Sequence, residues 1–172
     1  MNDILNAIKD RHSCKKYLDK QVDMDLLLQV AEAGKYAPSA MNRQSPVFLV
    51  VNNKELRDEI AKLNADVMNS GDDPFYGAPA VIVVLADKNN SNHVYDGSLA
   101  AENMMLAASS LGLGSCWIHR AKEVFETQRG KQILKDAGIE GEYEGICNII
   151  VGYPDGPLTE KPRKDNYIYI VK

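Results

Sequence analysis

The chain has 172 residues, of which 45% are hydrophobic and 26% are charged, and this balance is typical of one globular domain over residues 1–172. Its net charge of -4 argues against a nucleic-acid-binding protein with a basic surface. No apolar stretch reaches the roughly 20 residues that a membrane helix needs, and the N-terminus lacks the apolar core of a signal peptide. We therefore expect a cytoplasmic protein that binds neither nucleic acid nor membrane.

Helical and strand patterns alternate along the chain. Asn2 or Asp3, Asp23, Asn53 and Thr127 are the expected N-caps. In the first half of the chain we expect a helix through residue 9, a helix from 23 that Pro38 ends, a strand over 45–51, a helix after 53, a loop over 71–80 and a strand over 81–86. In the second half we expect a helix over 92–111, a short extended piece over 115–118, a helix over 127–137, a strand over 145–153 and a final strand over 166–172.

This mixture predicts an α+β or α/β fold with one sheet flanked by helices. The helix over 92–111 is apolar on nearly all its faces from Leu99 onward, which in so small a chain suggests that a partner subunit also covers it. The proline-rich connection over 154–165 is extended and charged. It could carry the alternating final segment to a distant sheet edge, including one on another subunit.

Common cofactor and metal motifs are missing from the sequence. The stretch GLGSCW is not a dinucleotide fingerprint, because Trp117 occupies the position of the third glycine. The three cysteines are odd in number and widely separated, which fits neither a disulfide framework nor a zinc site. The three histidines are equally scattered, so we expect no metal.

Three polar segments remain as candidates for chemistry. The stretch RHSCKKY over 11–17 holds four basic side chains, and APSAMNRQ over 37–44 follows the end of a helix. EKPRK over 160–164 places Lys161 and Arg163 on an extended backbone, where both can point the same way. A local basic cluster on an acidic background fits a small anion better than a polyanion. Each segment alone is more often a solvated loop.

Together these segments resemble a known family. RHSCKKY resembles the Arg-(Arg/His)-Ser-x-(Arg/Lys)-x-(Phe/Tyr) opening of the nitroreductase family of FMN-dependent oxidoreductases. APSAMNRQSPVFLVV resembles that family's next block, LGLGSCWI its block after the central helix, and VGYPDG with KPRK its closing block. The four blocks occur in the right order and cover the chain end to end.

The resemblance implies an α+β nitroreductase-like fold, with a mixed or antiparallel central sheet, that forms an interlocked homodimer with two FMN molecules in its interface. The residues that it implies around the FMN phosphate are Arg11, Ser13, Lys161 and Arg163, with His12 along the ribityl chain and Lys15 near the pyrimidine edge of the ring. The residues that it implies from the partner subunit are Pro38, Ser39, Ala40, Asn42 and Gln44. The residues that it implies behind the ring, where a backbone N–H could meet flavin N5, are Trp117, Ile118 and His119.

The activity that the resemblance implies is hydride transfer from NADH or NADPH through FMN to a small organic acceptor, such as a nitroaromatic or a quinone, in a ping-pong cycle. No side chain need act as acid or base, so we expect no catalytic residue. The alternative is a flavin-storage protein that turns over nothing. The chain departs from the family pattern in its short region after Asn64, in Pro46 where Trp is frequent, and in His119 where several members carry Glu.

Overall fold

The computed structural model describes residues 2–172, and its centre is an antiparallel sheet of four strands. The strands are β1 (Pro46–Val51), β2 (Ala80–Asp87), β3 (Gly114–Ile118) and β4 (Tyr143–Gly152). They are ordered β1-β2-β4-β3, so β2 and β4 are central while β1 and β3 form the two edges. The expected single sheet is confirmed.

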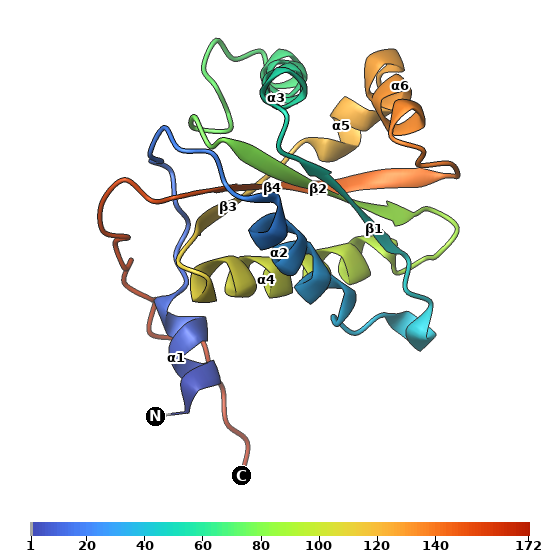
Figure 1. Cartoon of the computed structure of the whole chain (residues 1–172). Helices are drawn as coiled ribbons and strands as arrows, with labels where there is room; N and C mark the ends of the chain where they lie inside the picture. Colours follow the sequence, from blue (N-terminus) through green and yellow to red (C-terminus); the bar gives the residue numbers. More distant parts are fainter. Residues whose placement is uncertain (1) are drawn as a thin grey trace.

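Helices cover both faces of this sheet (Figure 1). They are α1 (Asp3–Asp10), α2 (Met24–Lys35), the short 3-10 helix η1 (Ala40–Asn42), α3 (Lys54–Met68), α4 (His93–Ser110), α5 (Ala121–Glu126) and α6 (Gln128–Asp136). Helices α2 and α4 lie on one face, and α3, α5 and α6 lie on the other. The two termini lie near each other beyond the end of α4.

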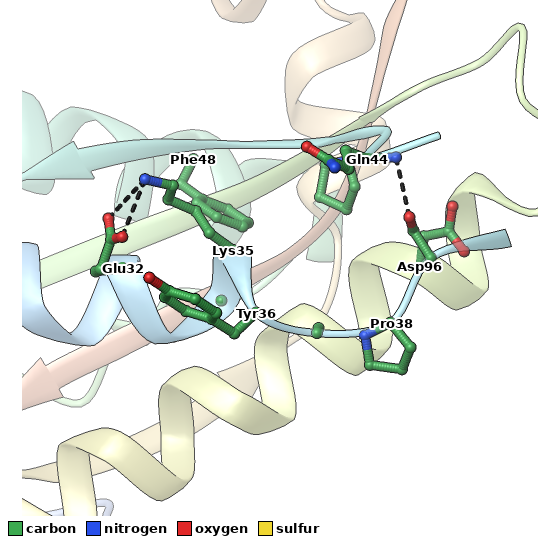
Figure 2. A pocket seen from close by; sticks show the side chains of 11 residues that line it. Glu32, Lys35, Tyr36, Pro38, Gln44, Phe48 and Asp96 are labelled. Carbon is green, nitrogen blue, oxygen red and sulfur yellow. Dashed lines mark hydrogen bonds and ion pairs between the residues drawn. The ribbon is translucent and has the colours of Figure 1, made fainter. Parts of the chain in front are cut away.

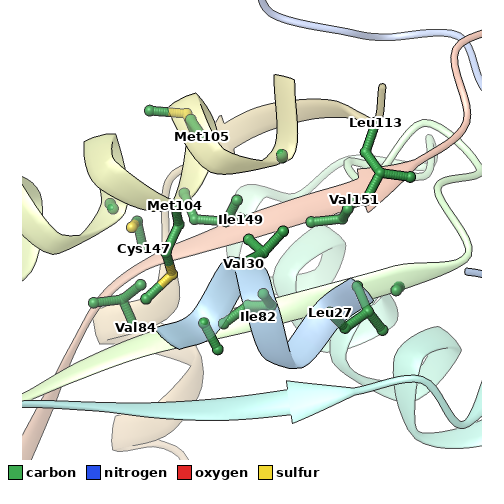
Figure 3. Packing of buried hydrophobic residues seen from close by; sticks show 14 of the residues in the cluster. Leu27, Val30, Ile82, Val84, Met104, Met105, Leu113, Cys147, Ile149 and Val151 are labelled. Atoms are coloured by element: carbon green, nitrogen blue, oxygen red, sulfur yellow. The ribbon is translucent and has the colours of Figure 1, made fainter. Parts of the chain in front are cut away.

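The core has two parts, one on each face of the sheet. Along β2, Ile82 and Val84 point to the α2 and α4 side, where Met104 fills the space between the helices (Figure 3). The alternate residues Val81 and Val83 point to the α3 side. Because both faces of β2 are buried, its sequence is a continuous apolar run rather than an alternating one.

Side-chain caps fix most of the helix starts that the sequence predicts. The side-chain oxygen of Asn2 accepts from the Ile4 N–H, that of Asn53 accepts from the Leu56 N–H, and that of Thr127 accepts from the Gly130 N–H. Asp23 is the N-cap residue of α2, but its side chain makes no cap hydrogen bond.

Two features differ from the sequence-based expectations. The segment over 166–172 is not a strand: Tyr167 to Val171 are 64–100% exposed and pair with no strand among residues 2–172. An alternating pattern shows which side chains could share one face of a strand, but it supplies no neighbouring strand to pair with. The short helix α5 was missed, because six residues are too few to show a helical period.

Strands β1 and β3 leave an edge of the sheet open on either side, and the candidate segments gather at these two edges. The loop before β1 carries η1 and packs on the start of α4. The N-terminal segment after α1 runs beside β3. Within residues 2–172, no helix is both long enough and apolar enough to cross a membrane.

Candidate functional site

The basic stretch over 11–17 lies as an extended strand-like segment against the edge of β3. Ser13 bridges in parallel with Ser115, and the Cys14 N–H donates to the Ser115 carbonyl across 2.9 Å. Cys14 is 1% exposed, whereas the neighbouring Ser13 and Lys15 are exposed. Side chains alternate along an extended backbone, so anchoring Cys14 turns Ser13 and Lys15 outward.

Tyr17 secures the end of this stretch. Its hydroxyl donates to the Cys14 carbonyl across 2.7 Å, and its backbone bridges with Pro154. Burial raises the pKa of the Tyr17 phenol far above its usual range, so the hydroxyl remains a donor. The bridge also brings the connection that follows β4 alongside the basic stretch.

A second contact holds the connection after β4 beside the basic stretch. Asp155 donates its N–H to the Lys16 carbonyl across 3.0 Å, and its carboxylate pairs with the Lys16 ammonium at 2.7 Å. From there the chain runs on through residues 156–163. Lys161 and Arg163 are thereby brought to the basic stretch, although almost 150 residues separate them in sequence.

These segments enclose what we call the basic cavity, a volume of about 360 Å³. Its polar and charged lining residues are Arg11, His12, Ser13, Lys15, Lys16, Asp155, Thr159, Lys161 and Arg163. The single carboxylate among them is already paired with Lys16. Arg11 lies near Glu102, but within residues 2–172 no ion pair engages Lys15, Lys161 or Arg163 in this lining. This donor set suits a phosphate group.

Arg11 has unmet donor capacity in this cavity. Its Nε lies 3.5 Å from Oε1 of Glu102 but is buried and makes no hydrogen bond to residues 2–172. The side chain is only 19% exposed. A buried guanidinium with a free donor is costly unless an acceptor reaches it, and an anion in the basic cavity supplies one.

A larger space of about 610 Å³, the aromatic cavity, adjoins the basic cavity and shares Ser13 and Lys15 with it. Trp117, Ile118, His119 and Arg120 line one side, and the loop carrying Tyr76 lines another. The Trp117 and His119 rings stack with centroids 5.4 Å apart. Lys15 lies at the junction, with its Nζ 5.2 Å from the centre of the Tyr76 ring.

The residues that line the two adjoining cavities fit the chemistry of FMN. The basic cavity offers charged donors for a phosphate, and the aromatic cavity offers rings and an edge strand for a planar heterocycle. Cys116 also lines the aromatic cavity, but burial raises the pKa of its thiol, which disfavours a reactive thiolate. Among residues 2–172 no group of three or more His, Cys, Asp or Glu side chains could hold a metal.

The remaining predicted site residues lie at the other edge of the sheet. The buried carboxylate of Asp96 on α4 organises them: it accepts from the Ala40 N–H across 3.0 Å and from the Ser45 hydroxyl across 2.9 Å. The Ser39 hydroxyl in turn accepts from the Gln44 N–H across 2.9 Å. Figure 2 shows Pro38, Gln44 and Asp96 around a cavity of about 360 Å³, which we call the β1-edge cavity.

The backbone of this segment is strained. Met41, Asn42 and Gln44 have φ values of 52, 52 and 49°, in the left-handed region that side-chain-bearing residues rarely adopt. Such strain persists where surrounding contacts impose it, and it clusters at binding sites. Asn42 and Gln44 remain exposed, with Gln44 Nε2 donating to Asn42 Oδ1 across 3.1 Å.

One chain therefore brings the predicted residues together in two groups, not in one site. The group at the β3 edge is Arg11, His12, Ser13, Lys15, Trp117, Ile118, His119, Lys161 and Arg163. The group at the β1 edge is Pro38, Ser39, Ala40, Asn42 and Gln44. Strands β2 and β4 separate the two edges.

The residues at the β3 edge that the sequence did not indicate include Tyr76 and Arg120, which line the aromatic cavity, and Asn64, which lies behind it. Tyr76 lies in a segment that is predicted only as a loop, and Arg120 follows His119, the last residue predicted there. Asn64 was detectable in principle, because it is a polar residue on the apolar stripe that Ile60 and Ala61 define in α3.

An α+β fold with adjoining basic and aromatic cavities is the scaffold of a protein that binds a phosphorylated, ring-bearing cofactor. Residues 8–153 match the sequence model of the nitroreductase family. The chain belongs to this family.

Individual relatives support the assignment to this family. Two archaeal proteins named as NADH dehydrogenase/NAD(P)H nitroreductase are similar to the chain. The one from Methanothermobacter thermautotrophicus is 35% identical over 124 residues, which cover 67% of this chain and 60% of that protein. The one from Archaeoglobus fulgidus is 31% identical over 173 residues, which cover 97% and 91%. The solved structure of a nitroreductase with bound FMN from Bacteroides fragilis is 29% identical and superposes with a TM-score of 0.90 over 100% of both chains.

Proposed function

We propose that this protein is an FMN-dependent oxidoreductase that takes a hydride from NADH or NADPH and passes it to a small organic acceptor, such as a nitroaromatic or a quinone, in a ping-pong cycle. The observation that carries the proposal is the junction of the basic and aromatic cavities at Ser13 and Lys15. The family and its FMN-bound member from Bacteroides fragilis support it.

FMN, when bound, supplies the hydride chemistry itself. The residues of this chain bind and orient it. Arg11, Ser13, Lys161 and Arg163 hold the phosphate through charge-assisted hydrogen bonds, and His12 approaches the ribityl chain. Lys15 offers a positive charge near the ring, and Trp117, Ile118 and His119 close the space behind it.

We propose further that the working unit is a homodimer and that each flavin site is shared. The group at the β1 edge, with Asn42 and Gln44, has the donors and acceptors that a flavin needs but lies at the wrong edge of its own sheet. In a two-fold dimer, the β1 edge of one chain can face the β3 edge of its partner. The symmetry then forms two equivalent sites, each with the β1-edge group of one chain and the β3-edge group of the other.

Exposed apolar side chains mark surfaces that such a dimer would cover. On α1 they are Ile4, Leu5 and Ile8, and on α4 they are Val94, Tyr95 and Leu99, each 44–69% exposed. The tail over 167–171 is more exposed still. It carries the alternating pattern of a strand, and the free edge of β1 on the partner offers it a place to pair.

The proposed activity has a direct optical test. Purified protein reconstituted with FMN is yellow, and under anaerobic conditions the proposal predicts that NADH or NADPH bleaches it. Addition of a quinone or nitroaromatic then restores the colour without further nicotinamide, as a ping-pong cycle requires. A yellow protein that neither nicotinamide bleaches contradicts the oxidoreductase and leaves flavin storage. A protein that takes up no flavin contradicts both.

A further inference from the structure

Asn64 of α3 is a polar side chain in an apolar setting. It is 0% exposed and lies on the helix face that carries Ile60 and Ala61, both part of the buried cluster on that side of the sheet. A leucine would fill such a position without any polar cost. The amide instead makes one directed contact: Nδ2 donates to the His119 carbonyl across 3.0 Å. Its Oδ1 has no partner among residues 2–172.

The carbonyl that Asn64 holds belongs to the peptide between His119 and Arg120, and both residues line the aromatic cavity. This peptide is trans, as are all those of the described chain. In a planar trans peptide the C=O and the N–H point in opposite directions. Since Asn64 lies in the interior and does not line the cavity, drawing the His119 carbonyl toward it turns the Arg120 N–H toward the cavity.

Two further observations concern the backbone from His119 to Ala121, which surrounding contacts hold in this conformation. Arg120 has a φ of 78°, in the left-handed region that is unfavourable for a residue with a side chain. On the next residue, the backbone of Ala121 approaches β4 so closely that a Cβ on Gly145 would lie 2.4 Å from it. The turn is therefore fixed by Asn64 from α3 and by the Gly145 contact from β4.

The Arg120 N–H has no acceptor among residues 2–172. The Arg120 side chain makes a separate contact, in which Nη1 donates to the Glu123 carboxylate across 2.7 Å. A backbone donor that is fixed in direction, unpaired and aimed at a cavity is ready to bind an acceptor there.

We propose that Asn64 is a positioning residue for the flavin ring. Its amide holds the peptide between His119 and Arg120 so that the Arg120 N–H meets an acceptor atom of the isoalloxazine ring. This inference rests on the proposed FMN site. The family resemblance implies only that some backbone N–H near Trp117 to His119 meets the flavin, whereas the inference names the Arg120 N–H and assigns its orientation to Asn64.

The test compares flavin affinity in wild type and Asn64→Leu, a change that keeps the branching of the side chain and deletes the donor. FMN and riboflavin are each titrated by quenching of flavin fluorescence. We expect both dissociation constants to rise about tenfold, which corresponds to about 1.4 kcal/mol. The ratio between them should stay that of wild type, because riboflavin lacks only the phosphate and the phosphate contacts are untouched.

A matched variant separates positioning from general stability. Asn52→Leu removes another amide that donates to a backbone carbonyl, that of Val22 across 2.8 Å, away from all three cavities. It should lower the melting temperature of the flavin-free protein without changing flavin affinity.

A measurement on wild type alone covers the case in which Asn64→Leu does not fold. Addition of FMN should move the amide resonance of Arg120 and slow its hydrogen exchange at least tenfold. An Arg120 amide that FMN leaves unchanged overturns the inference, as does Asn64→Leu protein that binds both flavins like Asn52→Leu. Wild type that binds neither flavin contradicts the proposed function itself, and the inference with it.

Discussion

The Lys15 ammonium lies 5.2 Å from the centre of the Tyr76 ring, at the junction of the basic and aromatic cavities. The aromatic face attracts the charge toward the aromatic cavity rather than toward the other cations of the basic cavity. Tyr76 is itself fixed by its loop, where the Asp73 carboxylate accepts from the Phe75 and Gly77 N–H groups.

Replacing Lys15 with methionine should lower the midpoint potential of bound FMN. The reduced flavin carries a negative charge, and a cation about 5 Å away at an effective dielectric near 20 stabilises it by about 3 kcal/mol, less where water enters. Since about 30 mV corresponds to 1.4 kcal/mol for a two-electron couple, we expect a drop of roughly 20–60 mV. Spectroelectrochemical titration of wild type and Lys15→Met at one pH measures it.

Lys16→Met is the matched control, because the Lys16 side chain is 77% exposed and its ammonium pairs with Asp155. It should leave the potential of the flavin where it is. A potential that stays the same or rises in Lys15→Met would show that Lys15 points to the phosphate or to solvent in the loaded protein.

Deleting the cations of the closing connection should empty the site without unfolding the chain. Each charge-assisted hydrogen bond to a phosphate is worth roughly 1.5–3 kcal/mol, so Lys161→Ala with Arg163→Ala should weaken FMN binding by about a hundredfold or more. Riboflavin binding should change little, because it lacks the phosphate. Fluorescence titration with both flavins gives the two ratios.

Lys164 provides the control for that double variant. It lies next to Arg163, but its ammonium contacts the Tyr167 ring and it does not line the basic cavity. Lys164→Ala should bind FMN as wild type does. Because a ligand that binds only the folded state stabilises it, the double variant should also lose the FMN-dependent rise in melting temperature. Wild-type FMN affinity in the double variant would mean that this connection is only a solvated loop.

The loop that carries Tyr76 should loosen at acid pH. Burial pulls the pKa of Asp73 upward, but the hydrogen bonds from Arg57 and from the Gly77 and Phe75 N–H groups outweigh it and hold the pKa below its usual range. A carboxylate with a lowered folded-state pKa stabilises the protein above its unfolded pKa of about 3.9, and this contribution is lost as pH falls through the folded value.

Asp73→Asn should therefore remove part of the acid dependence of stability. Denaturant unfolding at about pH 3, 4, 5 and 7 should show wild type losing more free energy of unfolding below about pH 4 than the variant does. Asp72→Asn, at the exposed neighbouring position, should follow wild type. Equal acid slopes in wild type and Asp73→Asn would show that the Arg57 pair contributes nothing to this loop.

Much of this architecture could be predicted from local sequence. The apolar run of β2 and the Asn53 and Thr127 caps are local patterns, and the structure contains the strand and the helices that they indicate. The resemblance of four short blocks then placed the basic residues in one site, a step that no local pattern supports because they lie far apart in the chain.

Other features depend on contacts that sequence patterns do not carry. Asn64 looked like one polar residue on a helix, and only the fold puts its amide on the His119 carbonyl. The conformation of Arg120 follows from what surrounds it, since arginine has no preference for positive φ. The tail over 167–171 has the pattern of a strand, but pattern alone does not say which chain supplies its neighbour.

The central claim is that two chains share each flavin site, and a hybrid dimer tests this claim most directly. One chain carries Lys161→Ala with Arg163→Ala and the other carries Ser39→Ala with Asn42→Ala, each with its own affinity tag. If the site is shared, one site of the hybrid holds all the changes and the other holds none. We predict that each parent dimer binds FMN weakly, while the doubly purified hybrid binds about one FMN per dimer with wild-type affinity. A hybrid that binds as weakly as its parents would contradict the shared site.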